Sequence, residues 1–506
     1  MGKQAAKDGV GQPQLQIVFP SENEGETNHR TGETENNGPP ASTAASAARK
    51  ETERKQTRRK WYSLIDKVYA LPNLQRAWQQ VAKNGGAAGV DGMTLARFRQ
   101  HLDERLPALA ADLRNKTYRP QPVRRVFIPK AGGGQRPLGI PTVRDRIVQQ
   151  ALLQVLSPIF EAKFSGRSHG FRPRRGCATA LSVVDQAVKY GYAWVVDADL
   201  MAFFDTVDHD RLIAALNEEV ADGSVLNLIT RLLKAGVSLP ETDAVEPTEW
   251  GTPQGGPLSP LLANVYLHRF DERMVQAGVG LVRYADDFVL FAKSESEARA
   301  ALSLAQEVLE GELGLRLHPE KTQVRSVADG FEFLGFHYFR DPKTDQLRKA
   351  VRKKSEQRFR ETVRQLTPRL KNQKRPKRRR MTAVRLGKNP RIREMVAALN
   401  RYLRGWHGYF QEVWSPYRTP FLRFDQFVRR RGRAAITGSQ GDGEDNRLLP
   451  NALLRQLGLI PLDEWQARYR SGQRTAPARK GPLGGEPDAG KPHVRFGRAG
   501  ERATSP

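Results

Sequence analysis

Hydrophobic positions first become dense and regular near residue 60. Residues 1–55 carry few large apolar side chains and are rich in Asn, Glu, Thr, Gly, Ser and Ala, which predicts disorder because such a segment buries too little apolar surface to fold. A helical periodicity begins at Trp61, and residues 98–114 and 145–161 have the spacing of amphipathic helices. The pattern predicts an ordered, helix-rich region after a disordered extension.

Two later runs have the character of β-strands and carry acids. In residues 281–290, apolar residues flank the adjacent acids of Tyr284-Ala285-Asp286-Asp287. Two carboxylates on a half-buried hairpin repel each other and lose hydration, so a metal ion that compensates them is one interpretation. An ordinary turn is the alternative, because Asp is common in turns and alternating apolar residues suit a hairpin.

A second acidic run favours the metal. Residues 192–205 form another β-type segment that ends in acids, among them Asp197, Asp199 and Asp205. Two such strand ends in one sheet would bring three carboxylates together, and Mg²⁺ prefers oxygen ligands of this kind. Two Mg²⁺ ions about 3.5 to 4 Å apart can hold the attacking and leaving oxygens of a phosphoryl transfer. The sequence therefore suggests phosphoryl-transfer chemistry.

The chain also resembles the reverse transcriptases encoded by group II introns, over roughly residues 60 to 435. Eight sequence blocks occur in the order of that family, beginning at Gly89, Ile128, His169, Asp199, Gly251, Tyr284, His318 and Phe333. The resemblance implies an α+β fold of the right-hand polymerase type, with fingers, a palm with an antiparallel sheet, and a helical thumb and maturase domain. It also implies a two-metal site that uses Mg²⁺.

Matching positions carry the family's catalytic roles. Asp199 and Asp286 correspond to the metal-binding pair and Asp287 to the third carboxylate, whereas Asp197 and Asp205 are taken as bystanders. The resemblance further implies substrate-binding roles. Phe204 would lie against the sugar of the incoming nucleotide, Lys130 and Arg136 would bind its triphosphate, Gln254 would lie in a glycine-flanked turn beside it, and Lys321 would donate a proton to pyrophosphate.

Structural alternatives exist for each of these substrate residues. Phe204 follows Phe203, and a Phe-Phe pair is often plain core packing. Lysines and arginines are common throughout this chain, so Lys130, Arg136 and Lys321 could each be solvated surface residues, and the segment around Gln254 could be a simple loop.

Charge independently indicates a nucleic-acid partner. The chain has a net charge of +28 and a pI of about 10.3, which favours phosphate backbones and a steep salt dependence. A basic membrane-surface protein is an alternative, but we find no long amphipathic or 18-residue apolar segment and expect no membrane partner. The single cysteine, Cys177, excludes an intramolecular disulfide and zinc sites built on paired cysteines. No targeting segment is visible, so we expect a bacterial cytoplasmic protein, associated with the nucleoid when bound to DNA.

Basic residues concentrate after residue 348, where only Glu356 and Glu361 oppose them up to residue 380. The run at 376–380 also resembles a nuclear import signal, which is a frequent false positive in nucleic-acid enzymes. We predict RNA-backbone contacts in this region and in a maturase-like segment, residues 399–410. The predicted contacts are Lys353, Lys354, Arg358, Lys371, Arg375, Lys377, Arg378, Arg401 and Arg404.

The maturase-like segment combines basic and aromatic residues. It has the pattern of an amphipathic helix broken by Gly405 and Gly408, with Trp406 and Tyr409 buried. After residue 438 comes an acidic linker and then a short helical pattern, residues 448–470, that could bind DNA as in related proteins. No cysteine follows Cys177, so a His-Asn-His endonuclease with cysteine pairs is not expected.

These observations predict a domain order and a function. We expect a disordered extension over 1–55, fingers over 56–190, palm over 191–340, thumb and maturase domain over 341–438, and a linker with a small C-terminal segment over 439–506. The resemblance implies an RNA-directed DNA polymerase that is also a maturase. It would bind its intron RNA to promote splicing and support retrohoming by target-primed reverse transcription. The partners would be the group II intron RNA, an RNA template with a DNA primer, target DNA and deoxynucleoside triphosphates.

Two alternatives remain at this point. The first is a domesticated or defence-associated reverse transcriptase of the same lineage, which would keep the polymerase and need not assist splicing. The second is a maturase whose polymerase is unused, although splicing assistance alone needs neither the acids nor the triphosphate-binding residues.

Overall fold

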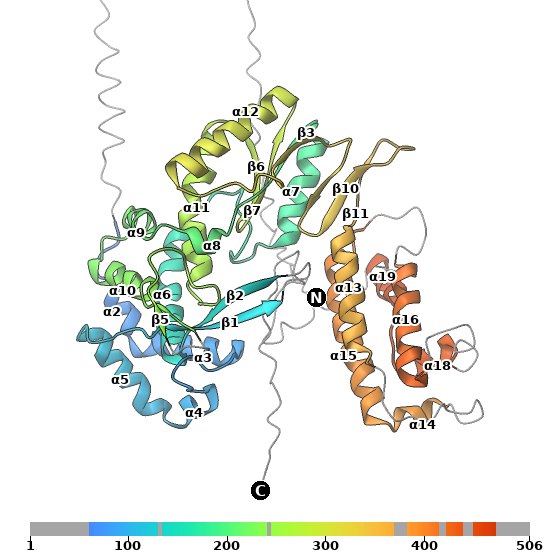
Figure 1. The fold of residues 1–506 in the computed structure, drawn as a ribbon, viewed down its shortest axis with the longest axis horizontal. Helices are drawn as coiled ribbons and strands as arrows, with labels where there is room; N and C mark the ends of the chain where they lie inside the picture. The colour runs from blue at the N-terminus through green and yellow to red at the C-terminus, as the bar shows by residue number, and fades with distance from the viewer. Residues whose placement is uncertain are drawn as a thin grey trace, which may run out of the picture.

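The computed structural model describes residues 60–129, 134–239, 244–368, 382–413, 421–438 and 449–471. This part of the chain combines α-helices with three β-sheets (Figure 1). The predicted N-terminal extension lies outside the described residues, as do most of the C-terminal tail and four of the predicted RNA contacts, together with Lys130. These four are Lys371, Arg375, Lys377 and Arg378.

Helices dominate the N-terminal part, as the periodicity predicted. They are α2 (Ile65–Tyr69), α3 (Leu71–Asn84), α4 (Leu95–Gln100), α5 (Leu102–Arg114) and α6 (Val143–Glu161). The helix expected over 98–114 is two helices, because His101 has non-helical backbone angles and ends α4. Between α5 and α6 lies a hairpin of β1 (Val123–Pro129) and β2 (Gln135–Ile140), which continues through β4 (Val237–Ser238) to β5 (Val245–Glu246).

A second sheet, all antiparallel, holds both acidic runs. Its strand order is β6-β7-β3-β8, with bounds β3 Trp194–Asp199, β6 Gly280–Tyr284, β7 Asp287–Ala292 and β8 Gln323–Ser326. The helices of this part are α7 (Cys177–Lys189), α8 (Phe203–Thr206), α9 (His209–Asn217), α10 (Gly223–Leu233), α11 (Ser259–Gln276) and α12 (Glu295–Gln306), which continues as a π-helical segment, η1 (Glu307–Glu312).

The two faces of this sheet belong to different hydrophobic cores. Alternate strand residues point to opposite faces, so Val196 and Leu290 join a first core with α11 and α12, whereas Val195 and Val289 join a second core. Apolar residues therefore occupy both faces, and the strands have nearly continuous hydrophobic runs.

The second core extends from this sheet into the C-terminal helices. The chain passes through a sheet of β9 (Phe331–Phe333), β10 (Phe336–Arg340) and β11 (Leu347–Val351) and then enters a helical body, seen on the right of Figure 1. Its helices are α13 (Lys353–Leu366), α14 (Ala383–Gly387), α15 (Pro390–Phe410), α16 (Leu422–Thr437), α18 (Asn451–Gln456) and α19 (Leu462–Arg470). None of the described helices is both long and apolar enough to cross a membrane.

One local prediction for the helical body was wrong. Helix α15 is not broken at Gly405 or Gly408 but runs through both to Phe410. Each glycine costs a helix about 1 kcal/mol. Burial of Leu403, Trp406 and Phe410 on one face contributes roughly 1.5–3 kcal/mol per side chain, which outweighs that cost.

The helical pattern expected over 448–470 is present as α18 and α19. Leu453 and Leu462 belong to the same second core as α15 and α16, so this segment packs into the helical body. The carboxylate of Asp425 on α16 accepts hydrogen bonds from the backbone N–H groups of Leu462 and Asp463 at the start of α19. That contact fixes α19 against α16.

Candidate active site

Two of the predicted catalytic carboxylates face each other across neighbouring strands. Asp199 ends β3 and Asp287 begins β7, and the two residues are direct partners in the antiparallel register. Side chains of such partners lie on one face of the sheet, with Cβ atoms about 4.5–5.5 Å apart. Strand pairing therefore brings together Asp199 and Asp287, which are far apart in the sequence.

The third carboxylate lies in the turn between β6 and β7. Tyr284 pairs with Asp287, so Ala285 and Asp286 form a two-residue hairpin turn. Ala285 has a φ of +61°, in the left-handed region that usually requires glycine at the first position of such a turn. Asp286 is 8% exposed. The sequence prediction of a hairpin with acids at its tip is thus confirmed in geometry.

Unfavourable electrostatics accompany this arrangement. Burial, together with the nearby carboxylates of Asp197 and Asp199, raises the pKa of the Asp287 carboxyl to about 8. Burial also raises the pKa of Asp197, two residues before Asp199 on the same strand face, to about 7. The structure therefore places Asp197, which was taken as a bystander, within the same electrostatic field. A bound cation would relieve the repulsion among these acids.

The residues present suit magnesium in their chemistry. Within the described ranges, no three Asp, Glu, His or Cys side chains are arranged as a ready protein-only metal site. Mg²⁺ does not need one, because it is usually held by one or two carboxylates and completes its shell with water and substrate phosphates. Mutually repelling oxygen ligands at one sheet end fit that mode, and Asp199, Asp286 and Asp287 would be the ligands.

Lys321 lies directly beside these acids. Its Nζ atom is 2.7 Å from Oδ2 of Asp199. Backbone contacts place it there, because the N–H of His318 donates to the Asp199 carbonyl and the N–H of Lys321 donates to the His318 carbonyl. The lysine side chain is 57% exposed, so this ion pair contributes little stability. Its position leaves the ammonium group accessible to a substrate.

Arg136 and Gln254, predicted to contact the nucleotide, are in contact with each other. Nε of Arg136 donates to Oε1 of Gln254 over 2.7 Å, and the N–H of Gly139 donates to the Gln254 carbonyl. Gly255 has a φ of +122°, and a Cβ atom there would lie 2.7 Å from the Gly139 carbonyl oxygen. Glycine at 255 is therefore required for the turn to lie against β2.

Phe204 is largely packed in the first core. Its side chain is 9% exposed and lies edge-to-face against Phe203, with ring centroids 5.2 Å apart. Its carbonyl accepts a hydrogen bond from the N–H of Thr252, just ahead of the turn that carries Gln254. The packing alternative thus describes most of this ring, and contact with a nucleotide sugar stays a prediction.

The described basic residues of the helical body differ in exposure. Lys353 and Lys354 are exposed at the start of α13, and Arg401 and Arg404 are exposed on α15, while Arg358 is half-buried. Trp406 is buried, as expected, and half-buried Tyr409 donates its hydroxyl proton to the Leu334 carbonyl.

One group of residues beneath the turn was missed by the sequence reasoning. Arg283 is fully buried on the first-core face, opposite to the carboxylates, and pairs with Asp271 of α11. The available signal was a charged residue inside the apolar run of β6, but its partner is on another element and could not be identified from spacing.

Comparisons with known proteins show which family the region around these residues resembles. Residues 128–338 match the family described as "Reverse transcriptase (RNA-dependent DNA polymerase)". "Protein YkfC" of Escherichia coli (strain K12) is 36% identical over 297 residues, which cover 51% of this chain and 77% of that protein. The family match therefore includes all three predicted catalytic carboxylates, and the alignment with YkfC covers most of that relative.

Two further relatives carry intron-related names. "Group II intron-encoded protein LtrA" of Lactococcus lactis subsp. cremoris is 41% identical over 203 residues, 40% of this chain and 33% of that protein. "Nuclear intron maturase 1, mitochondrial" of Arabidopsis thaliana is 40% identical over 94 residues, 19% of this chain and 13% of that protein. The chain thus spans about a third of LtrA and less of the plant protein. Taken with the reverse transcriptase match, these similarities show that the chain belongs to the family of reverse transcriptases encoded by group II introns.

Proposed function

We propose that this protein is an RNA-directed DNA polymerase that extends a 3′-hydroxyl primer along an RNA template, with Asp199, Asp286 and Asp287 as its catalytic carboxylates. The observation that carries the proposal is the direct cross-strand pairing of Asp199 with Asp287 beside the turn that holds Asp286. The raised pKa of Asp287 supports a cation there, because deprotonated acids at this sheet end repel each other.

The proposed fold assignment follows the right-hand polymerases. The helices α2–α6 with the β1–β2 hairpin would be the fingers, the β6-β7-β3-β8 sheet the palm, and α13 to α19 the thumb and maturase domain. Arg136 and Gln254 would then reach the nucleotide from the fingers side, while the acids reach it from the palm.

The reaction proposed is nucleotidyl transfer. The primer 3′-hydroxyl loses its proton to water, its oxygen forms a bond to the α-phosphorus of the nucleotide, and the bond from that phosphorus to pyrophosphate breaks. Two Mg²⁺ ions, when bound, would lower the pKa of the 3′-hydroxyl and neutralise the leaving oxygens. Arg136 would bind the triphosphate with its planar guanidinium. Lys321, with an accessible ammonium group, would supply the proton that pyrophosphate takes up.

A maturase role is proposed for the helical body. Lys353, Lys354, Arg401 and Arg404 present exposed positive charge on α13 and α15, which suits an RNA backbone. The protein would bind its group II intron RNA and favour the splicing-competent form, with the splicing chemistry left to the RNA. The polymerase and the RNA-binding helical body together would support retrohoming by target-primed reverse transcription, in which the target DNA supplies the primer.

Primer extension on an annealed RNA template, with Mg²⁺ and deoxynucleotides, tests the polymerase. We expect extension by the intact chain, and a loss of at least about 100-fold in Asp286→Asn, because that change keeps the shape and removes a charge that interacts with the metal. Asp210→Asn, an exposed carboxylate at the start of α9, is the control and should retain activity.

The outcomes separate the alternatives. Equal extension by the intact chain and Asp286→Asn would refute the assigned site. Absence of extension by the intact chain, combined with tight binding to intron RNA, would favour a maturase whose polymerase is unused. Splicing of an intron RNA with and without the protein, at low Mg²⁺, tests the maturase role separately.

A further inference from the structure

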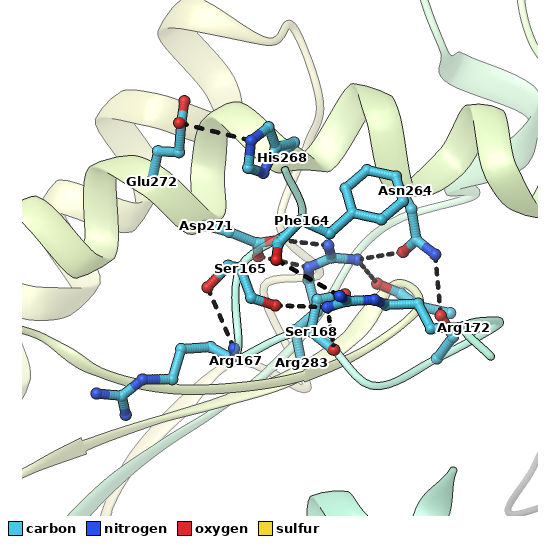
Figure 2. Close-up of polar contacts among 12 residues, drawn as sticks. Phe164, Ser165, Arg167, Ser168, Arg172, Asn264, His268, Asp271, Glu272 and Arg283 are labelled. Carbon is cyan, nitrogen blue, oxygen red and sulfur yellow. Dashed lines mark hydrogen bonds and ion pairs between the residues drawn. The ribbon is translucent and has the colours of Figure 1, made fainter. Parts of the chain in front are cut away.

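A buried ion pair lies directly beneath the turn that carries Asp286. Nε of Arg283 donates to Oδ1 of Asp271 over 2.6 Å, and Nη2 of Arg283 is 2.5 Å from Oδ2 of Asp271. The guanidinium therefore binds the carboxylate in a bidentate manner (Figure 2). Neither residue has measurable exposure. Both charged groups lose their hydration at this depth, and that cost can exceed the attraction between them. The pair therefore need not be there to stabilise the fold.

The remaining guanidinium nitrogen contacts the turn itself. Nη1 of Arg283 donates to the carbonyl of Ala285 over 2.8 Å and to Oδ1 of Asn264 over 3.1 Å. Ala285 immediately precedes Asp286 and is the residue held at a φ of +61°. A non-glycine residue keeps such a conformation only when its surroundings enforce it. Arg283 supplies a hydrogen bond at the position where that enforcement is needed.

Asn264 of α11 links the same group to a second backbone segment. Its Nδ2 donates to the carbonyl of Gly170 over 2.9 Å. Gly170 lies so close to the turn that a Cβ atom would be 2.3 Å from the backbone nitrogen of Ala285. The N–H of His169 donates to the Arg283 carbonyl, and the N–H of Arg283 donates to the Arg167 carbonyl. The segment 167–170 therefore supports the hairpin from its side.

Arg172 holds the segment 167–170 in place. Its guanidinium contacts the carboxylate of Glu161 and donates to the carbonyls of Ser165 and Ser168, as Figure 2 shows for the labelled residues. The hairpin turn thus contacts α11 through Arg283 and Asn264, and it also contacts the segment 167–170, which Arg172 holds in place.

We propose that Arg283, Asp271 and Asn264 act as positioning residues that set the Ala285–Asp286 turn, and with it the distance of Asp286 from Asp199. The inference rests on the proposed function of these carboxylates. None of the three would touch substrate. Mutation of a group that orients a metal ligand without binding the metal typically lowers metal affinity or activity 10- to 100-fold. We expect an effect of about this size here.

The decisive variant replaces the ion pair with apolar residues, Arg283→Met with Asp271→Leu. Such replacements of buried pairs often leave stability unchanged or raised, so the protein should fold. We expect it to bind primer-template within about twofold of the unaltered chain. It should require roughly 10-fold more Mg²⁺ for half-maximal extension and lose about 10-fold or more in kcat.

A second readout does not depend on activity. Hydrogen exchange of the peptide that spans residues 280–292 should be faster in the double variant, because the Ala285 carbonyl has lost its hydrogen bond. Asn264→Ala, which leaves the ion pair intact, should give the same change to a smaller degree. The control is Arg299→Gln with Glu295→Gln, an exposed ion pair on α12, and should alter neither readout.

The results distinguish two failures. A folded double variant with unaltered Mg²⁺ requirement, kcat and hairpin exchange would overturn the positioning role. Absence of extension by the unaltered chain would refute the proposed function instead, and faster hairpin exchange in the variants would still support control of the turn by Arg283.

Discussion

At the scale of single residues, the backbone of the hairpin that carries Asp286 is contacted by a histidine, His169, that resists protonation. His169 is 3% exposed, and its backbone N–H donates to Arg283. The Thr179 hydroxyl donates its proton to the Gly176 carbonyl, so Nδ1 of His169 must donate to Thr179. Burial and the surrounding arginines, first Arg175, lower the pKa of His169 to about 3. The neutral ring is therefore part of the folded structure.

This predicts a loss of stability in mild acid. The unfolded chain protonates His169 near pH 6.5 and the folded chain only near pH 3, so the stability contribution is complete above pH 6.5 and decreases as the pH falls toward 3. Between pH 7.5 and 5.5 the loss is about 1.4 kcal/mol. In His169→Asn, whose amide can still donate to Thr179, that loss should disappear from urea unfolding curves measured at both pH values.

His101→Asn provides the matched control for this prediction. His101 is exposed on the helical N-terminal part, and its replacement should leave the difference between the two pH values unchanged. An equal pH dependence in His169→Asn and the unaltered chain would show that other groups cause the acid sensitivity.

At the scale of elements, helix α15 shows how packing decides a helix that local propensity disfavours. Gly405 is exposed within α15, and a Cβ atom there would meet nothing within 4 Å. Gly438 also has open space around it but has a φ of +74° at the end of α16. The two glycines therefore differ in backbone conformation rather than in steric surroundings.

We expect opposite effects from the same substitution at these two positions. Gly405→Ala should stabilise the protein by about 0.5–1 kcal/mol, because alanine favours the helix. Gly438→Ala should destabilise it by about 1 kcal/mol, because a left-handed conformation is strained for alanine. Chemical unfolding measures both. Destabilisation by Gly405→Ala would mean that α15 is not a regular helix at this position.

Which parts of the fold could be predicted depended on whether the information was local. The β6–β7 hairpin and the β3 strand followed from apolar runs that flank or end in acids, and α6 followed from its periodicity. The break in α15 was predicted wrongly, because glycine propensity is local whereas burial of Trp406 depends on α13 and α16. Arg283 and Asp271 were missed for the same reason.

The residues of the candidate site show a similar division. The resemblance assigned Arg136 and Gln254 to one substrate, but their mutual hydrogen bond depends on the fold of the β2 strand against a distant turn. The electrostatic coupling of Asp197 to Asp287 also required the strand register, because it joins acids from two separate sequence runs.

At the scale of the whole molecule, one hydrophobic core joins the sheet that holds the acids to the basic helical body. Lys349 strengthens the junction, since its Nζ lies 2.9 Å from Asp185 of α7 and 2.8 Å from Glu412 just after α15. The basic residues proposed to bind RNA on the helical body are therefore attached to the sheet that holds the acids. We expect the exposed basic residues of α13 and α15 to contribute to RNA binding.

This predicts which charges determine salt-dependent binding. The slope of log Kobs for RNA against log salt is negative, and its magnitude should fall by about 0.7–0.9 per lost phosphate contact. We expect this in Lys353→Gln/Lys354→Gln and in Arg401→Gln/Arg404→Gln. Arg269→Gln/Arg299→Gln removes the same charge from exposed positions on α11 and α12 and should leave the slope unchanged. Filter binding of intron RNA at 50–400 mM salt, roughly the range in which the slope is measurable, gives the comparison. An equal decrease in all three variants would mean that RNA responds to total charge, whereas a decrease confined to the helical body would locate the interface on α13 and α15.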